Sequence, residues 1–408
     1  KPSLVVSTAF TNNGTSSFGG ATFGAGAVLT SGGNVTFPNG ADGAGNLTLA
    51  VTGTVDFQAG SDITTNLVSN AGTSTIFSGG NSTIGGTYNV PVAPATGTIS
   101  TAGTFSVSGT SQIDGAFVDN NDGAATTFTG LVTVSGTGTF TTTTVATTTN
   151  MNFGAGIANA GTVTTPTANF TGTGAVSGAG TYTVTGNVLV TGAVTVTNQV
   201  TNLTIGGTLD GTVAGSTWIN DINTNFHYQH ATAPMATGAL TANNNNSNFY
   251  YDLNGAQAVK DGSYFNLIFD AGGVKTSAGN ITVGGDWTLA SGVTFDPAAG
   301  NFDVTGTSVL AGTLADGTVA GTTTLAVTNL SGGTIDGSAT GVVNITGAVT
   351  LPTADPTIGR ATLTFTNTLT IPTGRTVTFN VNSPTGVKTF GTVVVDLGGT
   401  WTSTLLNT

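Results

Sequence analysis

Short strand-like segments follow one another along the whole chain, and this pattern limits the folds that the sequence can adopt. Each segment alternates apolar residues with Thr or another polar residue, and Gly, Asn or Ser separates it from the next. We expect strands at Leu4–Val6, Val35–Phe37, Leu47–Val51, Val55–Phe57, Phe105–Val107, Leu131–Val134, Tyr182–Val184, Val188–Val190, Val194–Val196, Leu203–Ile205, Phe265–Phe269, Ile281–Val283, Trp287–Leu289, Val293–Phe295 and Phe302–Val304. A doubly wound sheet needs a crossover helix after each parallel strand, so the close spacing favours a solenoid.

The choice of residues also argues against helices. All 18 acidic residues are Asp, and after Lys1 no basic residue appears until Lys260. Glu, Lys, Arg, Met and Gln usually fill exposed helix faces, whereas Thr, Val, Gly and Asn are poor helix formers. Charged residues make up 6% of the chain, against about 25% in typical soluble domains. The sequence therefore predicts an all-β protein whose surface is wetted by Thr, Ser, Asn and backbone.

Internal repeats indicate coils that arose by duplication. VTNLTIGGTLDGTVAG (200–215) returns as VTNLSGGTIDGSATG (327–341), and FSVSGTSQIDG (105–115) as FDVTGTSVLAG (302–312). A short strand with one apolar face cannot bury that face alone, but coils stacked about 4.8 Å apart share a continuous core. We predict a right-handed parallel β-helix (β-solenoid), an elongated rod with coils of roughly 20 residues.

Turn residues are expected at the corners of the coils, where Gly and Asp-Gly pairs tolerate tight backbone conformations. Asp114-Gly115, Asp210-Gly211 and Asp336-Gly337 are predicted to lie there. A string of β-sandwich domains is the competing fold, but it needs longer strands and a recurring buried aromatic residue. Trp218, Trp287 and Trp401 are spaced too irregularly for that fold.

One stretch departs from the repeat and divides the chain. We expect solenoid repeats over residues 1–217, an irregular insertion or a long-turn coil over 218–250, and solenoid repeats over 251–408 that continue past the C-terminus. The middle stretch holds both His residues, an aromatic cluster and an Asn tract. It is expected either to protrude as a loop or to form a coil with longer turns.

A family resemblance lies in the third segment. GAQAVKDGSYFNLIFDAGGVKTSAGNITVGGDWTLASGVTFD (255–296) contains in order a Gln-x-Val, a Gly-x-Tyr-x-Asn-Leu, a Lys-Thr and an Asn-Ile-Thr-Val-x-Gly-x-Trp-Thr. GVKTFGTVVVDLGGTWT (386–402) is a second, partial copy. These runs resemble the repeats of large secreted cell-surface proteins of Bacteroidota, including gliding-motility adhesins. The resemblance implies an extracellular place at the bacterial cell surface and export by the type IX secretion route.

Composition excludes several function classes. A net charge of −12 argues against nucleic-acid binding, which needs a basic surface to displace counterions from phosphates. The absence of Cys removes disulfides, thiolate metal sites and Cys nucleophiles. No run of about 18 apolar residues is present, so we expect no membrane insertion. No sequence motif indicates a cofactor, and we predict none.

The few candidate site residues gather in the middle stretch. His227 and His230, with Asp221 nearby, could hold zinc or act as acid and base, although an ordinary polar loop is the favoured interpretation. Aromatic side chains in the same stretch could stack on sugar rings, although core packing explains them equally well. The predicted glycan contacts are Trp218, His227, Tyr228, His230, Tyr250 and Tyr251. We predict no catalytic residue and no metal site.

Other candidate chemistry is weaker. Asp119 and Asp122 are carboxylates of the kind that polysaccharide lyases use, but no basic residue lies near them in the sequence, so they are expected in turns. Asn-x-Thr sequons at Asn34, Asn46, Asn202 and Asn280 are explained by Asn entering a strand, with glycosylation as an option.

The Thr run at 142–149 suggests an ice-binding face, but the spacing of Thr is expected not to hold from coil to coil.

The sequence thus predicts a non-enzymatic extracellular structural protein, a segment of a bacterial surface filament or adhesin. A carbohydrate-active β-helix enzyme, with its site near Asp221 and His227, is one alternative. A glycan-binding or ice-binding module is another. The expected partners are other copies or further repeats of the same chain, stacked through the end coils, and surface glycans.

Overall fold

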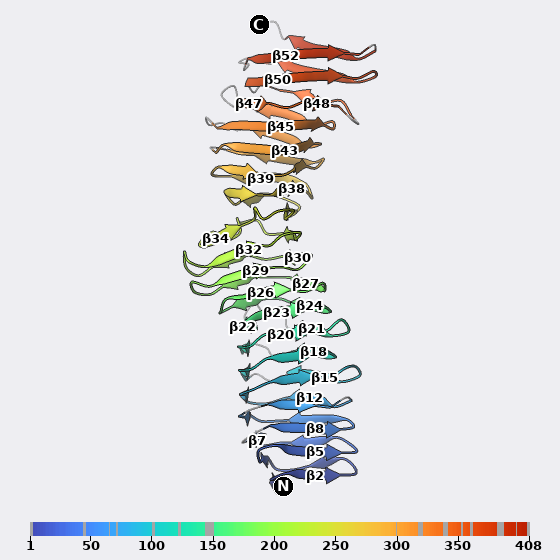
Figure 1. Ribbon diagram of the computed structural model, residues 1–408, viewed down its shortest axis with the longest axis vertical. Helices are drawn as coiled ribbons and strands as arrows, with labels where there is room; N and C mark the ends of the chain where they lie inside the picture. Colours follow the sequence, from blue (N-terminus) through green and yellow to red (C-terminus); the bar gives the residue numbers. More distant parts are fainter. Residues whose placement is uncertain are drawn as a thin grey trace. The chain divides into compact units, whose positions relative to one another are not determined.

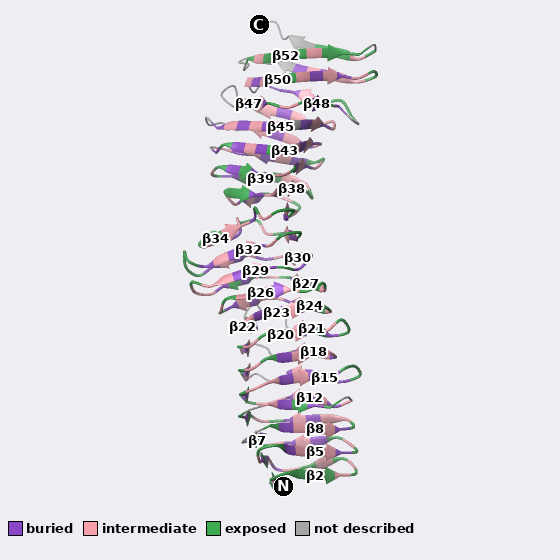
Figure 2. Cartoon of the chain, viewed as in Figure 1, coloured by how far each residue is buried: buried purple, intermediate pink, exposed green. Residues whose placement is uncertain are grey.

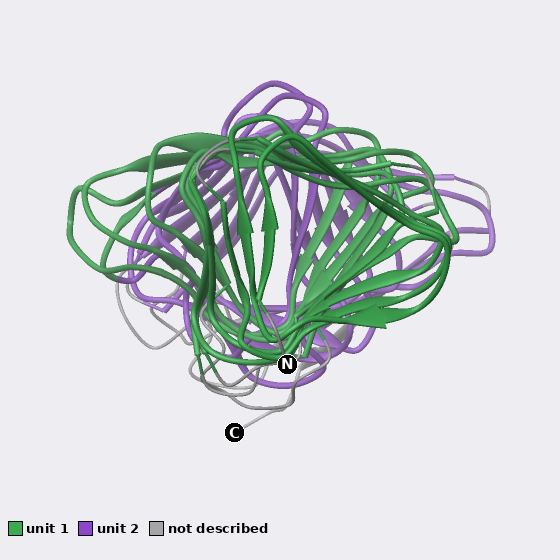
Figure 3. Cartoon of the chain, turned by 90° about the horizontal axis from the view of Figure 1, so that it is seen from below, with its two compact units in different colours: residues 1–218, 237–239 green, residues 219–236, 240–408 purple. Residues whose placement is uncertain are grey.

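The computed structural model contains two compact units, which Figure 3 colours separately. Unit 1 comprises residues 1–218 and 237–239, and unit 2 comprises residues 219–236 and 240–408. The structure describes residues 3–43, 46–64, 66–70, 72–99, 103–120, 124–142, 151–298, 300–316, 321–337, 342–351, 354–359, 362–381, 387–396 and 398–405. Over these residues the protein is all-β, without a helix, and every strand pairing is parallel (Figure 1).

Unit 1 is a parallel β-solenoid in which each turn contributes one strand to each of three ladders. Sheet A contains β1 (Leu4–Val6), β4 (Ala21–Phe23), β7 (Ala41–Gly43), β10 (Ser61–Ile63), β13 (Ser82–Ile84), β16 (Phe105–Val107), β19 (Thr126–Phe128), β22 (Met151–Phe153), β25 (Ala168–Phe170), β28 (Val188–Val190) and β31 (Leu209–Gly211). Sheet B contains β2 (Ala9–Asn12), β5 (Ala27–Ser31), β8 (Leu47–Val51), β11 (Leu67–Ser69), β14 (Tyr88–Val90), β17 (Ser111–Ile113), β20 (Val132–Val134), β23 (Gly156–Asn159), β26 (Gly174–Ser177) and β29 (Thr195–Asn198).

Sheet C is the third ladder of unit 1. It contains β3 (Ser16–Ser17), β6 (Val35–Phe37), β9 (Thr54–Phe57), β12 (Ser74–Phe77), β15 (Thr96–Ile99), β18 (Ala116–Asp119), β21 (Thr139–Thr142), β24 (Thr162–Thr165), β27 (Thr181–Val184) and β30 (Asn202–Ile205). The strands β32 (Thr217–Asn220) and β34 (Ala239–Thr241) each contain residues of both units.

Unit 2 is a parallel β-solenoid with longer strands toward the C-terminus. Sheet D contains β36 (Gln257–Val259), β39 (Gly273–Ser277), β42 (Val293–Asp296), β44 (Thr313–Asp316), β46 (Thr334–Gly337), β49 (Thr357–Ile358), β51 (Thr376–Val381) and β53 (Thr400–Leu405). The remaining strands are β33 (Asn225–Tyr228), β35 (Asn248–Tyr251), β37 (Gly262–Tyr264), β38 (Asn266–Phe269), β40 (Ile281–Val283), β41 (Trp287–Leu289), β43 (Phe302–Leu310), β45 (Thr322–Leu330), β47 (Val342–Ile345), β48 (Val349–Thr350), β50 (Thr362–Ile371) and β52 (Lys388–Val395). β43 pairs with both β40 and β41, so two ladders merge into one long strand.

The expected β-solenoid of short strands is therefore confirmed, while the right hand of its coil stays a prediction. Most of the predicted strands match the observed ones within one or two residues, and Phe302–Val304 is the first part of the longer β43. Period-two alternation made these strands predictable, because it places every second side chain in the core. Figure 2 shows the alternation as bands of buried and partly exposed residues along the strands.

The core of each unit consists of aliphatic and aromatic side chains that stack from turn to turn. In unit 1, the ring centroids of Phe37 and Phe57 are 5.6 Å apart, and those of Phe57 and Phe77 are 5.1 Å apart. In unit 2, the ring centroids of Phe269 and Phe295 are 4.6 Å apart. Parallel pairing in register brings the Phe residues of unit 1 together in this way, whereas Phe269 and Phe295 lie on different ladders and meet across the core. Each turn thus buries the apolar face of its neighbours.

The corners were predicted less well than the strands. Asp114-Gly115 lies at a bend, but Asp210-Gly211 ends β31 and Asp336-Gly337 ends β46, so two of the three expected Asp-Gly corners are wrong. At Gly211 a Cβ atom would lie 2.5 Å from the Cβ of Ser216. This Gly is therefore explained by close packing at the strand end and not by a turn.

Register is kept although the turns differ in length. Asn152 donates a hydrogen bond to Thr127, 25 residues earlier, and accepts one from Asn169, 17 residues later. The strands stay aligned because the turns differ in the number of residues that connect one strand to the next, and not in the pairing of the strands. Coil length is therefore a poor guide to which residues lie side by side.

Asn side chains fix several of these connections. Asn34 Oδ1 accepts a hydrogen bond from the backbone of Thr54, Asn280 Oδ1 accepts one from the backbone of Asn301, and Asn46 Oδ1 accepts one from Asn66 Nδ2. Three of the four predicted sequon Asn residues thus link one turn to the next, as an Asn that enters a strand is expected to do.

Residues 218–250 form more regular structure than an irregular insertion would. β33 lies in this segment and β35 begins in it, and the two strands pair in register from Asn225 opposite Asn248 to Tyr228 opposite Tyr251. Asn248 Nδ2 donates to Asn225 Oδ1 at 2.7 Å, and Asn266 Nδ2 donates to Asn248 Oδ1 at 2.8 Å. The stretch 229–238 between the two strands contains no strand. The arrangement is that of a coil with a long connection.

Candidate functional site

Three of the predicted glycan contacts are core residues, which corrects the prediction for them. Trp218, Tyr228 and Tyr251 are each 0% exposed. Alternation places Phe226 and Tyr228 on the inner side of β33, and Tyr251 on the inner side of β35. Their rings pack against other aromatic residues and present no face on which a sugar could stack. The sequence alone did not reveal which of two alternate residues faces inward.

Outward residues of β33 and β35, together with the residues that directly follow these strands, form a cluster in unit 2. It is here called the His227 cluster and consists of His227, Gln229, Tyr250 and Asp252. His227 and Tyr250 are register partners, and their rings stack at 4.2 Å with an interplanar angle of 13°. His227 Nδ1 lies 2.8 Å from Asp252 Oδ2, and Gln229 Nε2 donates to the same oxygen at 3.4 Å. The His227 side chain is 29% exposed and that of Asp252 is 15% exposed.

This geometry gives the His227 ring a fixed orientation. A carboxylate bound to one ring nitrogen orients an imidazole, and the other nitrogen is then available to a ligand or a proton. Asp252 Oδ1 is buried and has no hydrogen-bond partner among the described residues. His227 and Tyr250 were predicted from the sequence, whereas Asp252 and Gln229 were not, because these join the site only through the pairing of β33 with β35.

His230 and Asp221 do not belong to the His227 cluster. His230 Nδ1 contacts Thr232 Oγ1 at 2.9 Å, within its own loop. Asp221 Oδ1 accepts a hydrogen bond from the backbone of Ile222, as in a local turn. In the part of the chain that the structure describes, no three His, Cys, Asp or Glu residues lie close enough together to hold a metal ion.

Asp119 is also placed differently from the expectation. It ends β18 and is fully buried, so it does not lie in an exposed turn. Asp122 lies outside the described residues.

No helix among the described residues is long and apolar enough to cross a membrane.

A buried lysine lies beside the His227 cluster and was not predicted as part of a site. Lys275 on β39 is 0% exposed, and its Nζ donates hydrogen bonds to the backbone oxygens of Leu253 and Gly255. Burial lowers the pKa of Lys275 to about 8, an effect that the charges of Asp252 and Asp270 oppose. A Lys at an inward position of an alternating strand is the sequence pattern that could have revealed it.

We expect the buried lysine to make stability depend on pH. Because the unfolded chain holds the Lys275 proton up to the ordinary pKa of 10.5, the free energy of unfolding should rise as pH increases from about 8. The slope from this one group is at most about 1.4 kcal/mol per pH unit. Urea unfolding between pH 7 and pH 10 measures it, and Lys275→Met should lose most of the rise. An equal slope in both proteins would contradict the assignment.

Above about pH 10 the trend should reverse. Burial raises the pKa of Tyr88, Tyr182, Tyr251 and Tyr264 well above its ordinary value of 10.0. The unfolded chain then loses protons that the folded protein keeps, so stability falls as pH rises further. A maximum in stability near pH 10 is therefore expected for the wild type.

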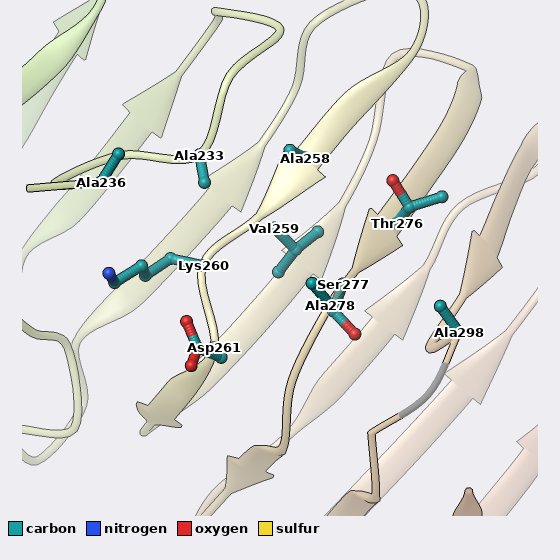
Figure 4. A pocket seen from close by; sticks show the side chains of 10 residues that line it. All are labelled: Ala233, Ala236, Ala258, Val259, Lys260, Asp261, Thr276, Ser277, Ala278 and Ala298. Atoms are coloured by element: carbon teal, nitrogen blue, oxygen red, sulfur yellow. The ribbon is translucent and has the colours of Figure 1, made fainter. Parts of the chain in front are cut away.

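A shallow groove of about 400 Å³ also lies in unit 2. Figure 4 shows Lys260 and Asp261 next to each other at one side of this groove. Small side chains line most of the rest: Ala233, Ala236, Ala258, Ala278 and Ala298. The groove holds one cation and one anion and has no aromatic platform among these residues, so it does not define a substrate by itself.

Comparison of the chain with family models, curated proteins and solved structures finds no match. The fold and the geometry of its surfaces are therefore the basis for a functional proposal.

Proposed function

We propose that this chain is a non-enzymatic structural segment of an extracellular bacterial surface filament or adhesin. The observation that supports it is the ladder: within each unit, strand after strand is hydrogen-bonded in parallel register to the strands one turn before and after it. Each turn shares backbone hydrogen bonds and a common apolar core with its neighbours. Such a body resists local opening, which a protein exposed outside the cell requires.

The surface chemistry is consistent with this role. The chain has only six Lys and Arg residues, and a protease that cuts after basic residues has few places to act. Thr, Asn and Ser occupy many outward strand positions and hydrate the surface without salt bridges. The resemblance to secreted Bacteroidota repeats supports a place at the bacterial cell surface. Further repeats or other copies of the chain are the partners that we propose, since parallel ladders extend by adding turns.

Surface labelling of the producing bacterium tests the proposal. An antibody against residues 1–408 should label intact cells, on fibres or at the cell surface. Labelling only after permeabilisation would overturn the extracellular assignment. The purified protein should also survive prolonged incubation with a protease of broad specificity. Rapid degradation of the folded protein would overturn the structural role, whatever its location.

The carbohydrate-active enzyme and the glycan-binding module stay predictions. If either holds, the His227 cluster is the part of the predicted region that a glycan could contact, because His227 and Tyr250 are partly exposed while Trp218, Tyr228 and Tyr251 are buried.

A further inference from the structure

One face of unit 1 carries a regular array of Thr side chains. It is built from the two outward positions of six successive strands of sheet C: β15, β18, β21, β24, β27 and β30. We call it the Thr face, and its residues are Thr96, Thr98, Ala116, Val118, Thr139, Thr141, Thr162, Thr164, Thr181, Thr183, Asn202 and Thr204. All of them are at least partly exposed.

The strand register aligns these residues in two columns. Thr139 pairs with Thr162, and Thr162 pairs with Thr181. In the second column, Thr141 pairs with Thr164, Thr164 with Thr183, and Thr183 with Thr204. The expectation that Thr spacing is lost from coil to coil is therefore wrong for this face. The turns between these strands differ in length, which hides the alignment in the sequence.

The run that first suggested such a face does not form it. Thr142 is buried at the inner side of β21, and residues 143–149 lie outside the described residues. The array instead uses Thr-x-Thr triplets that lie a full turn apart in the sequence.

The Thr face forms a two-dimensional lattice of hydroxyl and methyl groups. Neighbouring strands of a parallel sheet are about 4.8 Å apart, and alternate residues of one strand are about 6.6 Å apart. The side-chain hydroxyls of Thr139, Thr141, Thr162, Thr164 and Thr181 make no hydrogen bond to another described residue, so they remain available to water. The spacing of about 4.8 Å between neighbouring strands lies close to an oxygen–oxygen repeat of hexagonal ice.

The array is also stiff and uncharged. Thr has a branched Cβ, which restricts its side chain to few rotamers in a strand. Beneath the face, the rings of Phe117 and Phe140 stack at 4.7 Å, and Val163 and Tyr182 are buried in the next two turns. The four strands β21, β24, β27 and β30 contain no charged residue. Because the Thr side chains already have few rotamers, they lose little conformational entropy when they hold water molecules in fixed positions.

We propose that the Thr face binds ice. Hydroxyl groups would anchor water molecules at lattice positions, and the methyl groups between them would hold further water in an ordered cage. A layer of water ordered in this way can merge with a growing crystal surface. This goes beyond the structural role, because it assigns a ligand to one face of unit 1.

Freezing assays on the full chain test the proposal. The wild type should shape ice crystals in a nanolitre osmometer and show thermal hysteresis. Thr162→Tyr places a bulky side chain in the middle of the array and should abolish most of the hysteresis. Thr83→Tyr is the matched control, because Thr83 is an exposed outward residue of β13 in sheet A of the same unit. This control should keep wild-type activity.

A milder variant separates shape from hydrogen bonding. Thr162→Val keeps the methyl group and the size of the side chain, and it should lose only part of the activity. Circular dichroism and thermal melting establish that each variant is folded. The proposal is overturned if the folded wild type neither shapes ice nor shows hysteresis, or if Thr162→Tyr and Thr83→Tyr behave alike. Binding to crystalline cellulose or chitin without any effect on ice would also overturn it.

Discussion

Replacing Trp287 by Ala should destabilise unit 2 by about 3–5 kcal/mol. Trp287 on β41 is 0% exposed, and its ring centroid lies 4.7 Å from that of Phe302, 5.9 Å from Phe295 and 6.3 Å from Phe269. The side chain fills the space between adjacent turns, so truncation leaves a cavity that rigid strands cannot close. Urea unfolding followed by circular dichroism measures the loss.

Trp287→Phe is the matched control for this prediction. The indole Nε1 of Trp287 is buried and has no hydrogen-bond partner among the described residues. Phe keeps an aromatic ring in the same position and removes this unsatisfied donor, so we expect a change within about 1.5 kcal/mol. If Trp287→Ala cost no more than Trp287→Phe, cavity formation would not be the source of the effect.

Gly273→Ala should cost more than an ordinary Gly to Ala change. Gly273 begins β39 with φ +77, a conformation that strains residues with a Cβ by about 1–3 kcal/mol. A Cβ atom there would also lie 2.3 Å from the backbone oxygen of Gly255. The backbone at Gly255 cannot move aside without breaking the register of Lys275 with Gln257. The free energy of unfolding of unit 2 is therefore expected to fall by about 3 kcal/mol or more, the upper end of that range.

Gly292→Ala separates the two causes. Gly292 has φ +80, but no atom lies within 4 Å of the place that a Cβ atom would occupy. Its substitution should cost only the conformational strain, about 1–2 kcal/mol. Equal losses for the two variants in denaturant unfolding would show that the contact with Gly255 is harmless.

The strands could be predicted from the sequence because they are local. Alternation of apolar and polar residues is visible within three or four residues, and β1, β6 and β16 match their predicted bounds. A solenoid needs nothing more than such segments and permissive turns. The class of fold therefore follows from residue choice and spacing alone.

Contacts between turns could not be predicted in the same way. Asp252 meets His227 across 25 residues, and Thr139 meets Thr162 across a turn of different length from the next. Such pairs depend on the number of residues in each connection between strands. Low-complexity connections carry little information about where one strand ends and the next begins. The same uncertainty concealed which of His227 and Tyr228 faces inward. Asp252 and Gln229 were missed for this reason, whereas Lys275 could have been found from its inward position in an alternating strand.

The tolerance of unequal turns has a consequence for how such a chain evolves. Asn152 keeps its register partners although 25 residues separate it from one and 17 from the other. We therefore expect insertions and deletions at the corners to leave the strand register intact. A single substitution at an outward strand position, in contrast, changes a surface column directly, so each face of the solenoid can change without the others.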